Sequence, residues 1–85
     1  MIVFPRLESW NSTAKMATIA ATVDKKRVLC RISLDILRDN FGASEQEPMR
    51  SIDEYRNNIQ AVAMKLIENE SYEEDGSILI RARDL

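Results

Sequence analysis

Two neighbouring segments in the first half of the chain alternate between apolar and polar residues, and this pattern constrains the fold more than any other feature. Every second side chain in residues 16–23 is apolar, and residues 27–33 repeat the alternation. A period of two residues is typical of a β-strand with one buried face. The two segments therefore predict two strands that share an apolar face, formed by Ala17, Ile19, Ala21, Val23, Val28, Cys30 and Ile32.

Residues 24–26 separate these strands and are short enough for a tight hairpin turn. A two-residue loop at the first two positions pairs Ala21 with Val28, whereas a loop at the last two positions pairs Ala21 with Cys30. Both registers keep the apolar side chains on one face. The loop has no glycine to supply the positive φ that tight hairpins favour, so the sequence leaves the register open.

The first fifteen residues lack a clear hydrophobic period. Phe4, Leu7 and Trp10 are spaced irregularly among polar residues, which indicates neither a helix nor a long strand. We expect residues 1–15 to form an irregular N-terminal arm that holds one short strand at most. Its aromatic side chains need an apolar surface on which to pack.

A short helix is predicted directly after the second strand. Ser33 can accept a hydrogen bond from a free amide of the first turn, and Asp35 lies near the positive end of the helix dipole. Gly42 occupies a position where a left-handed residue commonly ends a helix. We expect a helix between Ser33 and Gly42, followed by a polar connection over residues 43–50.

Residues 51–54 (Ser-Ile-Asp-Glu) have the pattern of a capping box, in which the Ser51 hydroxyl and the Glu54 carboxylate each accept a bond from the other residue's amide. An acidic run over residues 68–75 opposes the negative end of a helix dipole. We predict one helix of about five turns that begins at Ser51 and frays near Asn69. Its apolar stripe contains Ile52, Tyr55, Ile59, Val62, Ala63 and Leu66.

The last apolar segment predicts a third strand. Asp75-Gly76 is a turn signal, and residues 77–83 alternate again. If the two helices form an antiparallel hairpin, antiparallel pairing of this strand with the second strand is the economical topology, whereas pairing with the first would be parallel. The order β-β-α-α-β defines a two-layer α+β fold in one domain, residues 1–85, with a three-stranded, mainly antiparallel sheet packed on two helices.

Short motifs along the whole chain resemble those of a small bacterial family, domain of unknown function 1488. They are Phe4-Pro5 with Trp10, Val28-x-Cys30-x-Ile32-Ser33, Leu37 with Phe41-Gly42, Arg56-x-x-Ile59 with Ala63, Gly76-x-Ile78 and the final Asp84-Leu85. The resemblance implies a two-layer α+β fold in a bacterial cytoplasmic protein, and it implies no activity, substrate or cofactor. The hairpin turn departs from the family pattern because it lacks a glycine.

The chain lacks the groups that most catalytic and metal sites need. It contains no histidine, and its single cysteine, Cys30, is best interpreted as a small core residue. Gly42 and Gly76 are too far apart to form a phosphate-binding loop. The acidic run over residues 68–75 does not have the ligand spacing of a calcium loop. We therefore expect no catalytic residue, no cofactor and no metal ligand.

Composition favours a cytoplasmic protein. A single cysteine excludes an intrachain disulfide, and no stretch has the pattern of an export signal or a membrane span. A net charge of −2 and a pI near 5.1 give no long-range attraction to nucleic acid or anionic lipid.

The face of the sheet that points away from the helices is predicted to mix aliphatic side chains with arginines instead of being plainly polar. The candidate interface contains Trp10, Leu29, Arg31, Leu79, Arg81 and Arg83. Three interpretations stay open. The arm folds back and its aromatic side chains cover Leu29 and Leu79, or this face or a free sheet edge binds a protein partner, above all a second copy, or the arginines contact nucleic acid.

We interpret the chain as a small, non-enzymatic interaction module that self-associates or binds another protein. The alternative is a nucleic-acid-binding accessory or regulatory protein that uses the arginine-bearing face, which the acidic pI disfavours. Catalysis by Glu54, Tyr55 or Arg56, near the start of the second helix, is a third hypothesis.

Overall fold

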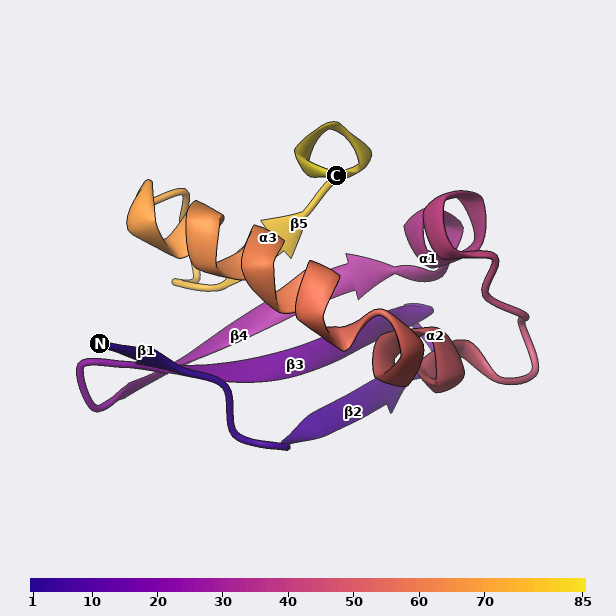
Figure 1. Ribbon diagram of the computed structural model, residues 1–85, viewed down its shortest axis with the longest axis horizontal. Coiled ribbons are helices and arrows are strands. Elements are labelled where there is room, and N and C mark those ends of the chain that lie inside the picture. Colours follow the sequence, from indigo (N-terminus) through magenta and orange to yellow (C-terminus); the bar gives the residue numbers. More distant parts are fainter.

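A mixed β-sheet, covered by helices on one face, organises the computed structural model of residues 1–85 (Figure 1). Four of its five strands lie side by side in the order β1-β3-β4-β5, and β2 also pairs with β3. The strands are β1 (Ile2–Val3), β2 (Glu8–Asn11), β3 (Met16–Val23), β4 (Lys26–Ser33) and β5 (Ile78–Ile80). The helices are α1 (Leu34–Phe41), α2 (Pro48–Glu54) and α3 (Arg56–Glu68), and a short 3₁₀ turn, η1 (Ala82–Asp84), ends the chain.

The hairpin of β3 and β4 adopts the first of the two registers that the sequence allows. Ala21 pairs with Val28, and the loop is Asp24-Lys25. Both loop residues have a positive φ, 49° for Asp24 and 72° for Lys25, as a tight primed turn requires. The Asp24 carboxylate also accepts a hydrogen bond from the amino group of Met1 at 2.8 Å, so the N-terminus fastens this turn.

The N-terminal arm is more regular than predicted, because it supplies two strands. Both β1 and β2 pair antiparallel with β3, and Trp10 is the direct partner of Ala17. Cross-strand partners share one face of a sheet, so Trp10 points to the same side as the buried Ala17. Two strands of two and four residues, separated by Pro5, are too short to leave a readable period in the sequence.

Helix α1 has the predicted ends. The Ser33 hydroxyl accepts a hydrogen bond from the amide of Ile36 at 3.3 Å. At the other end, Gly42 has a φ of 66° and its amide donates to the carbonyl of Arg38 at 3.1 Å. Both caps act within a few residues of the helix, which is why the sequence reveals them.

The predicted capping box at Ser51 is wrong. Helix α2 begins three residues earlier, at Pro48, whose fixed φ and missing amide hydrogen suit a first helical position. Ser51 is a buried residue inside α2, and the Glu54 carboxylate pairs with Arg50 at 3.2 Å instead of bonding to the amide of Ser51. The expected single helix is also divided, since Tyr55 leaves helical geometry between α2 and α3. The predicted end near Asn69 is confirmed.

Strand β5 runs parallel to β4, so the expected antiparallel pairing is wrong. Arg31 of β4 is the partner of Leu79 in a parallel register. The prediction assumed that two helices each cross the sheet. In the structure α1 and α2 gather at the end of the sheet where β4 finishes, and α3 alone runs back along it (Figure 1). One return crossing makes the next strand parallel to the last.

The third strand is also shorter than predicted. It ends at Ile80, and residues 82–84 turn into η1. The carboxylate of Asp84 accepts a hydrogen bond from the amide of Arg81 at 2.9 Å, which closes this turn. Arg83 therefore lies in η1 and not on a strand.

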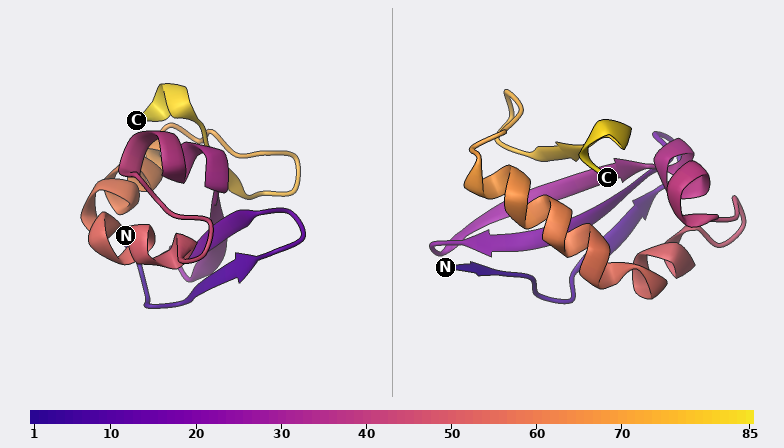
Figure 2. Two further views of the ribbon diagram at one scale, coloured as in Figure 1. Left: turned by 90° about the vertical axis from the view of Figure 1, so that its right-hand side faces the viewer. Right: turned by 45° about the horizontal axis from the view of Figure 1, so that its top comes forward.

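The core lies between the helices and the inner sheet face, which we define as the face toward the helices (Figure 2). All the side chains predicted to point inward from the hairpin are buried except Val23, which is partly buried against the core. The largest fully buried side chains are Cys30, Ile32, Leu37, Ile52, Ile59, Ile78 and Ile80. No helix in the structure is both long and apolar enough to cross a bilayer.

Candidate functional site on the outer sheet face

The outer sheet face, which points away from the helices, is the candidate site. Strand register assigns its members, because cross-strand partners share a face. Thr18 is the partner of both Ser9 and Arg31, Ala20 is the partner of Leu29, and Leu79 lies beside Arg31. The outer sheet face consists of Val3, Ser9, Asn11, Met16, Thr18, Ala20, Thr22, Arg27, Leu29, Arg31, Ser33 and Leu79.

Leu29 is the central apolar residue of this face and is 38% exposed. Its two neighbours along β4, Val28 and Cys30, are buried because they point into the core. Beside it, Leu7 follows the sheet through a hydrogen bond from the amide of Ala20 to its carbonyl at 3.0 Å, and Leu7 is exposed as well. The middle of the outer sheet face is thus apolar and open.

The arm does not cover Leu29. Phe4 and Trp10 both pack against the core on the inner face, because the pairing of β2 with β3 turns Trp10 toward Ala17. This finding overturns the interpretation in which the aromatic side chains of the arm fold over the outer face. Neither the arm nor a helix shields Leu29.

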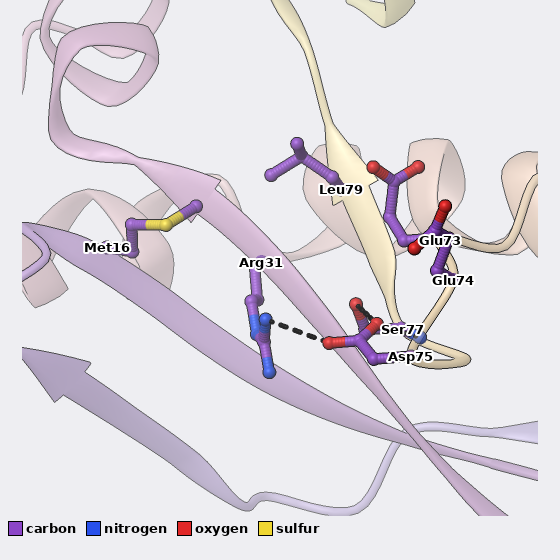
Figure 3. A pocket seen from close by; sticks show the side chains of 7 residues that line it. All are labelled: Met16, Arg31, Glu73, Glu74, Asp75, Ser77 and Leu79. Atoms are coloured by element: carbon purple, nitrogen blue, oxygen red, sulfur yellow. Dashed lines mark hydrogen bonds and ion pairs between the residues drawn. The ribbon is translucent and has the colours of Figure 1, made fainter.

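Two hollows with charged linings lie on this face, and Leu29 lines the first of them. The first, which we call the arm hollow, measures about 210 Å³ and lies on the β3 side, with Leu7, Ala20 and Arg27 in its lining. The second, which we call the acidic groove, measures about 580 Å³ and lies on the β5 side (Figure 3). The acidic groove is lined by Met16, Arg31, Glu73, Glu74, Asp75, Ser77 and Leu79.

Arg31 points toward the loop that precedes β5 (Figure 3), where its guanidinium lies 3.3 Å from the Asp75 carboxylate. The same carboxylate accepts hydrogen bonds from the Ser77 hydroxyl at 2.6 Å and the Ser77 amide at 2.9 Å. These bonds from Ser77 lower the pKa of Asp75, and the charge of Arg31 contributes less. The Asp75 carboxylate is therefore held ionised at the rim of the acidic groove.

The other two predicted arginines, Arg81 and Arg83, do not lie together with Arg31. Arg81 lies just beyond β5, and its guanidinium pairs with Glu73 of the acidic groove at 3.1 Å. Arg83 lines a small hollow on the helix side together with Lys65 of α3 and Asn69, the residue that follows α3. Of the six predicted interface residues, the structure therefore brings Leu29, Arg31 and Leu79 together on the face, with Arg81 at its margin. Trp10 packs against the core and also lines a hollow of about 670 Å³ together with Leu29 and Arg31, and Arg83 lies elsewhere.

Arg27 and the acidic loop are the parts of the site that sequence reasoning missed. Arg27 is exposed, has the same strand parity as Leu29 and Arg31, and makes no ion pair within the chain. The parity was a usable signal. The loop of residues 73–75 could not be placed, because its position beside β4 depends on the parallel pairing of β5.

The residues considered for catalysis are engaged in structural contacts. Arg56 binds both oxygens of the Glu8 carboxylate and also contacts Asp53, and hydrogen bonding to Glu8 is the main reason that the pKa of Arg56 is raised. The rings of Tyr55 and Phe41 stack with centroids 4.7 Å apart. Glu54 pairs with Arg50. These contacts join β2, α1 and α2 to the start of α3.

Cys30 is a core residue, as predicted. Its side chain is fully buried in β4, and this burial raises the pKa of its thiol to about 11. A thiol with such a pKa stays protonated near neutral pH and is a poor nucleophile. No three histidine, cysteine, aspartate or glutamate side chains come together in a group that could hold a metal ion.

The fold and its open sheet face define a small α+β protein with a one-sided sheet. Residues 2–80 match the family described as "Protein of unknown function (DUF1488)". Because the match spans nearly the whole sequence, the chain belongs to this family, and the resemblance noted in the sequence motifs is confirmed.

A solved structure supports the same fold. The chain is similar to a protein of unknown function from the DUF1488 family of Shewanella loihica PV-4, whose crystal structure was determined at 1.60 Å resolution. The two share 21% sequence identity and superpose with a TM-score of 0.85, over 93% of this chain and 90% of the other. At this identity the likeness shows the fold alone. No curated protein matches the chain.

Proposed function

We propose that this chain is a non-enzymatic interaction module that binds a protein partner through its outer sheet face. The observation that carries the proposal is the exposure of Leu29 in the middle of the sheet. An antiparallel sheet with one covered face normally presents polar side chains on the other. Here the centre is aliphatic and arginines lie around it, which matches the apolar core and polar rim of protein interfaces.

Nucleic acid fits this face less well than a protein does. Binding to phosphates needs several unpaired cations, but Arg31 and Arg81 are already paired with Asp75 and Glu73. Carboxylates of the acidic groove would repel a phosphate backbone, and the net charge of −2 adds to this repulsion. Leu29 would also gain little from contact with phosphate groups.

The proposal places the module in the cytoplasm, where its one cysteine stays reduced. Cys30 is free and buried, as suits a reducing compartment.

Site-specific photo-crosslinking in the cell that produces the protein tests the proposal. A photoreactive amino acid replaces Leu29 in one variant and Met64 in the other. Met64 is the matched control, because it is 36% exposed and lies on α3, on the opposite side of the molecule. We expect a discrete protein adduct from position 29 and none from position 64. An adduct with nucleic acid at position 29, or equal labelling at both positions, would contradict the proposal.

A further inference from the structure

We infer that the protein partner presents an acidic segment, whose carboxylates bind unpaired cations at one end of the outer sheet face while its apolar side chains cover the aliphatic residues there. This inference rests on the proposed function and names the chemistry of the partner. The surface concerned lies beside the β3–β4 turn, and we call it the basic end. It consists of Val3, Leu7, Leu29, Arg6, Lys25 and Arg27.

Three aliphatic side chains form the centre of the basic end. Val3 is the partner of Thr22 on β3. One row further along β3, Ala20 pairs with Leu29 and donates a hydrogen bond from its amide to the carbonyl of Leu7 at 3.0 Å. Val3, Leu7 and Leu29 are 49%, 47% and 38% exposed. Aliphatic residues exposed together in this way mark a surface that a partner can cover.

Cations without a partner lie around this aliphatic centre. Arg27 has the strand parity of Leu29 and lines the arm hollow. Lys25 lies in the adjoining turn, and Arg6 directly precedes Leu7 in the loop between β1 and β2. All three cations are exposed, and none makes an ion pair within the chain. Each is therefore available to a partner without breaking an existing contact.

The carboxylates on the same segments already have other partners. Asp24, in the turn, pairs with the amino group of Met1 at 2.8 Å. Glu8, at the start of β2, pairs with Arg56 of α3. The basic end therefore keeps a local positive charge, although the net charge of the chain is −2. Clusters of unpaired cations are typical of surfaces that recognise acidic motifs.

The rest of the outer sheet face favours a protein segment over larger polyanions. A membrane surface or a long nucleic acid would extend across the whole face and meet the acidic groove, where Glu74 is exposed and makes no ion pair. The basic end also offers no aromatic side chain on which a base could stack. A short acidic segment can stay within the basic end and use its aliphatic centre.

Titration with a synthetic peptide tests the inference. The probe is a short peptide in which glutamates flank a central pair of leucines, and it is added to the full chain while methyl signals are followed by NMR. We expect the signals of Val3, Leu7 and Leu29 to shift and that of Met64, on α3, to stay in place. A matched peptide with lysine in place of glutamate should leave the three signals unchanged. Shifts of the same size with both peptides would overturn the inference.

Charge reversal supplies matched variants. Lys25→Glu combined with Arg27→Glu reverses two cations of the basic end, and we expect it to bind the acidic peptide about tenfold more weakly. Lys65→Glu combined with Arg83→Glu is the control, because it makes the same change of charge at two exposed, unpaired residues on the helix side. The spectrum of each variant shows whether it has kept the fold. Equal weakening in the two double variants would contradict the inference, as would wild-type binding that does not weaken with added salt.

Two further probes separate the classes of anionic partner. Vesicles that contain phosphatidylserine, or a single-stranded oligonucleotide, take the place of the peptide. If either binds more tightly than the acidic peptide, and Lys25→Glu combined with Arg27→Glu abolishes that binding, the acidic segment is overturned in favour of a membrane or of nucleic acid.

The outcomes also separate the inference from the proposed function. If the acidic peptide shifts none of the three signals but position 29 crosslinks to a protein in the cell, the interaction module stands and only the acidic segment fails. If position 29 gives no protein adduct, the proposed function fails and the inference fails with it.

Discussion

Arg31 of β4 and Leu79 of β5 are direct neighbours in a parallel strand pair. This pairing brings the loop before β5 to the edge of the outer sheet face, where Asp75 meets Arg31. An apolar centre, two arginines on β4 and an acidic rim are thus combined on one surface. The proposed interface depends on this arrangement, and the following predictions test the contacts that build it.

Replacing Arg56 by methionine should destabilise the fold. The side chains of Glu8 and Arg56 are each only 17% exposed, so the variant leaves a poorly solvated carboxylate without its partner. We expect the free energy of unfolding to fall by about 2 kcal/mol, measured by urea denaturation with an unchanged m value. Arg50→Met, which breaks two solvent-exposed ion pairs, is the control and should have a much smaller effect.

A double variant sharpens this test. Changing both Glu8 and Arg56 to methionine removes the unpaired charge, so we expect a smaller loss than in Arg56→Met alone. Equal losses in Arg56→Met and Arg50→Met would contradict a role for this pair in fastening β2 to α3.

The Asp75 carboxylate should titrate below its ordinary pKa of 3.8. Because its pKa is lowered in the folded state, it contributes stability above the unfolded pKa, and this contribution is lost as the pH falls through the folded pKa. NMR titration of the carboxylate carbon measures the midpoint. Ser77→Ala should raise the pKa of Asp75 more than Arg31→Gln does, since hydrogen bonds from Ser77 are the larger cause. The reverse order would show that the ion pair dominates.

The hairpin turn should be stabilised by glycine at its second position. Lys25 has a φ of 72°, which is costly for a residue with a side chain. We expect Lys25→Gly to raise the free energy of unfolding by about 0.5 kcal/mol, after the entropy that glycine loses on folding. Lys26→Gly is the control, since Lys26 is the first residue of β4 and gains nothing from a left-handed conformation. Destabilisation by Lys25→Gly in thermal unfolding would argue against this turn geometry.

Two serines distinguish the true helix cap from the false one. Ser33→Ala should lower the free energy of unfolding by about 1 kcal/mol, because it removes the bond to the amide of Ile36. Ser51→Ala should leave stability within about 0.5 kcal/mol, because Ser51 lies inside α2 and alanine is the better helix former. A loss of similar size in Ser51→Ala, measured by the same denaturation experiment, would instead support Ser51 as a helix cap.

Structural features that depend on residues close together in the chain were the ones best predicted from the sequence. The β3–β4 hairpin, the caps of α1 and the end of α3 each depend on a few adjacent side chains, and all were predicted. The capping box failed although it is local, because Pro48 and the burial of Ser51 set the start of α2 instead. Local patterns compete, and tertiary packing selects among them.

Parts of the site that depend on distant pairing could not be predicted. Trp10 is turned inward by the register of β2 on β3, and the acidic loop reaches Arg31 only because α3 crosses the sheet once. Neither relationship leaves a periodic trace in the sequence. The alternation that puts Leu29 and Arg31 on one face is visible in the sequence. The outer sheet face was therefore predicted correctly, whereas the N-terminal arm and the acidic loop of residues 73–75 were misplaced.

The most direct test of the outer sheet face as an interface is partner binding by Leu29→Glu, with Met64→Glu as control. Both positions are similarly exposed, at 38% and 36%, so each variant tolerates the new charge to a similar degree. In chemical crosslinking in the cell that produces the protein, we expect wild type and Met64→Glu to give the same discrete protein adduct, and Leu29→Glu to lose it. An adduct that persists in Leu29→Glu, or one that Met64→Glu disrupts equally, would contradict the account.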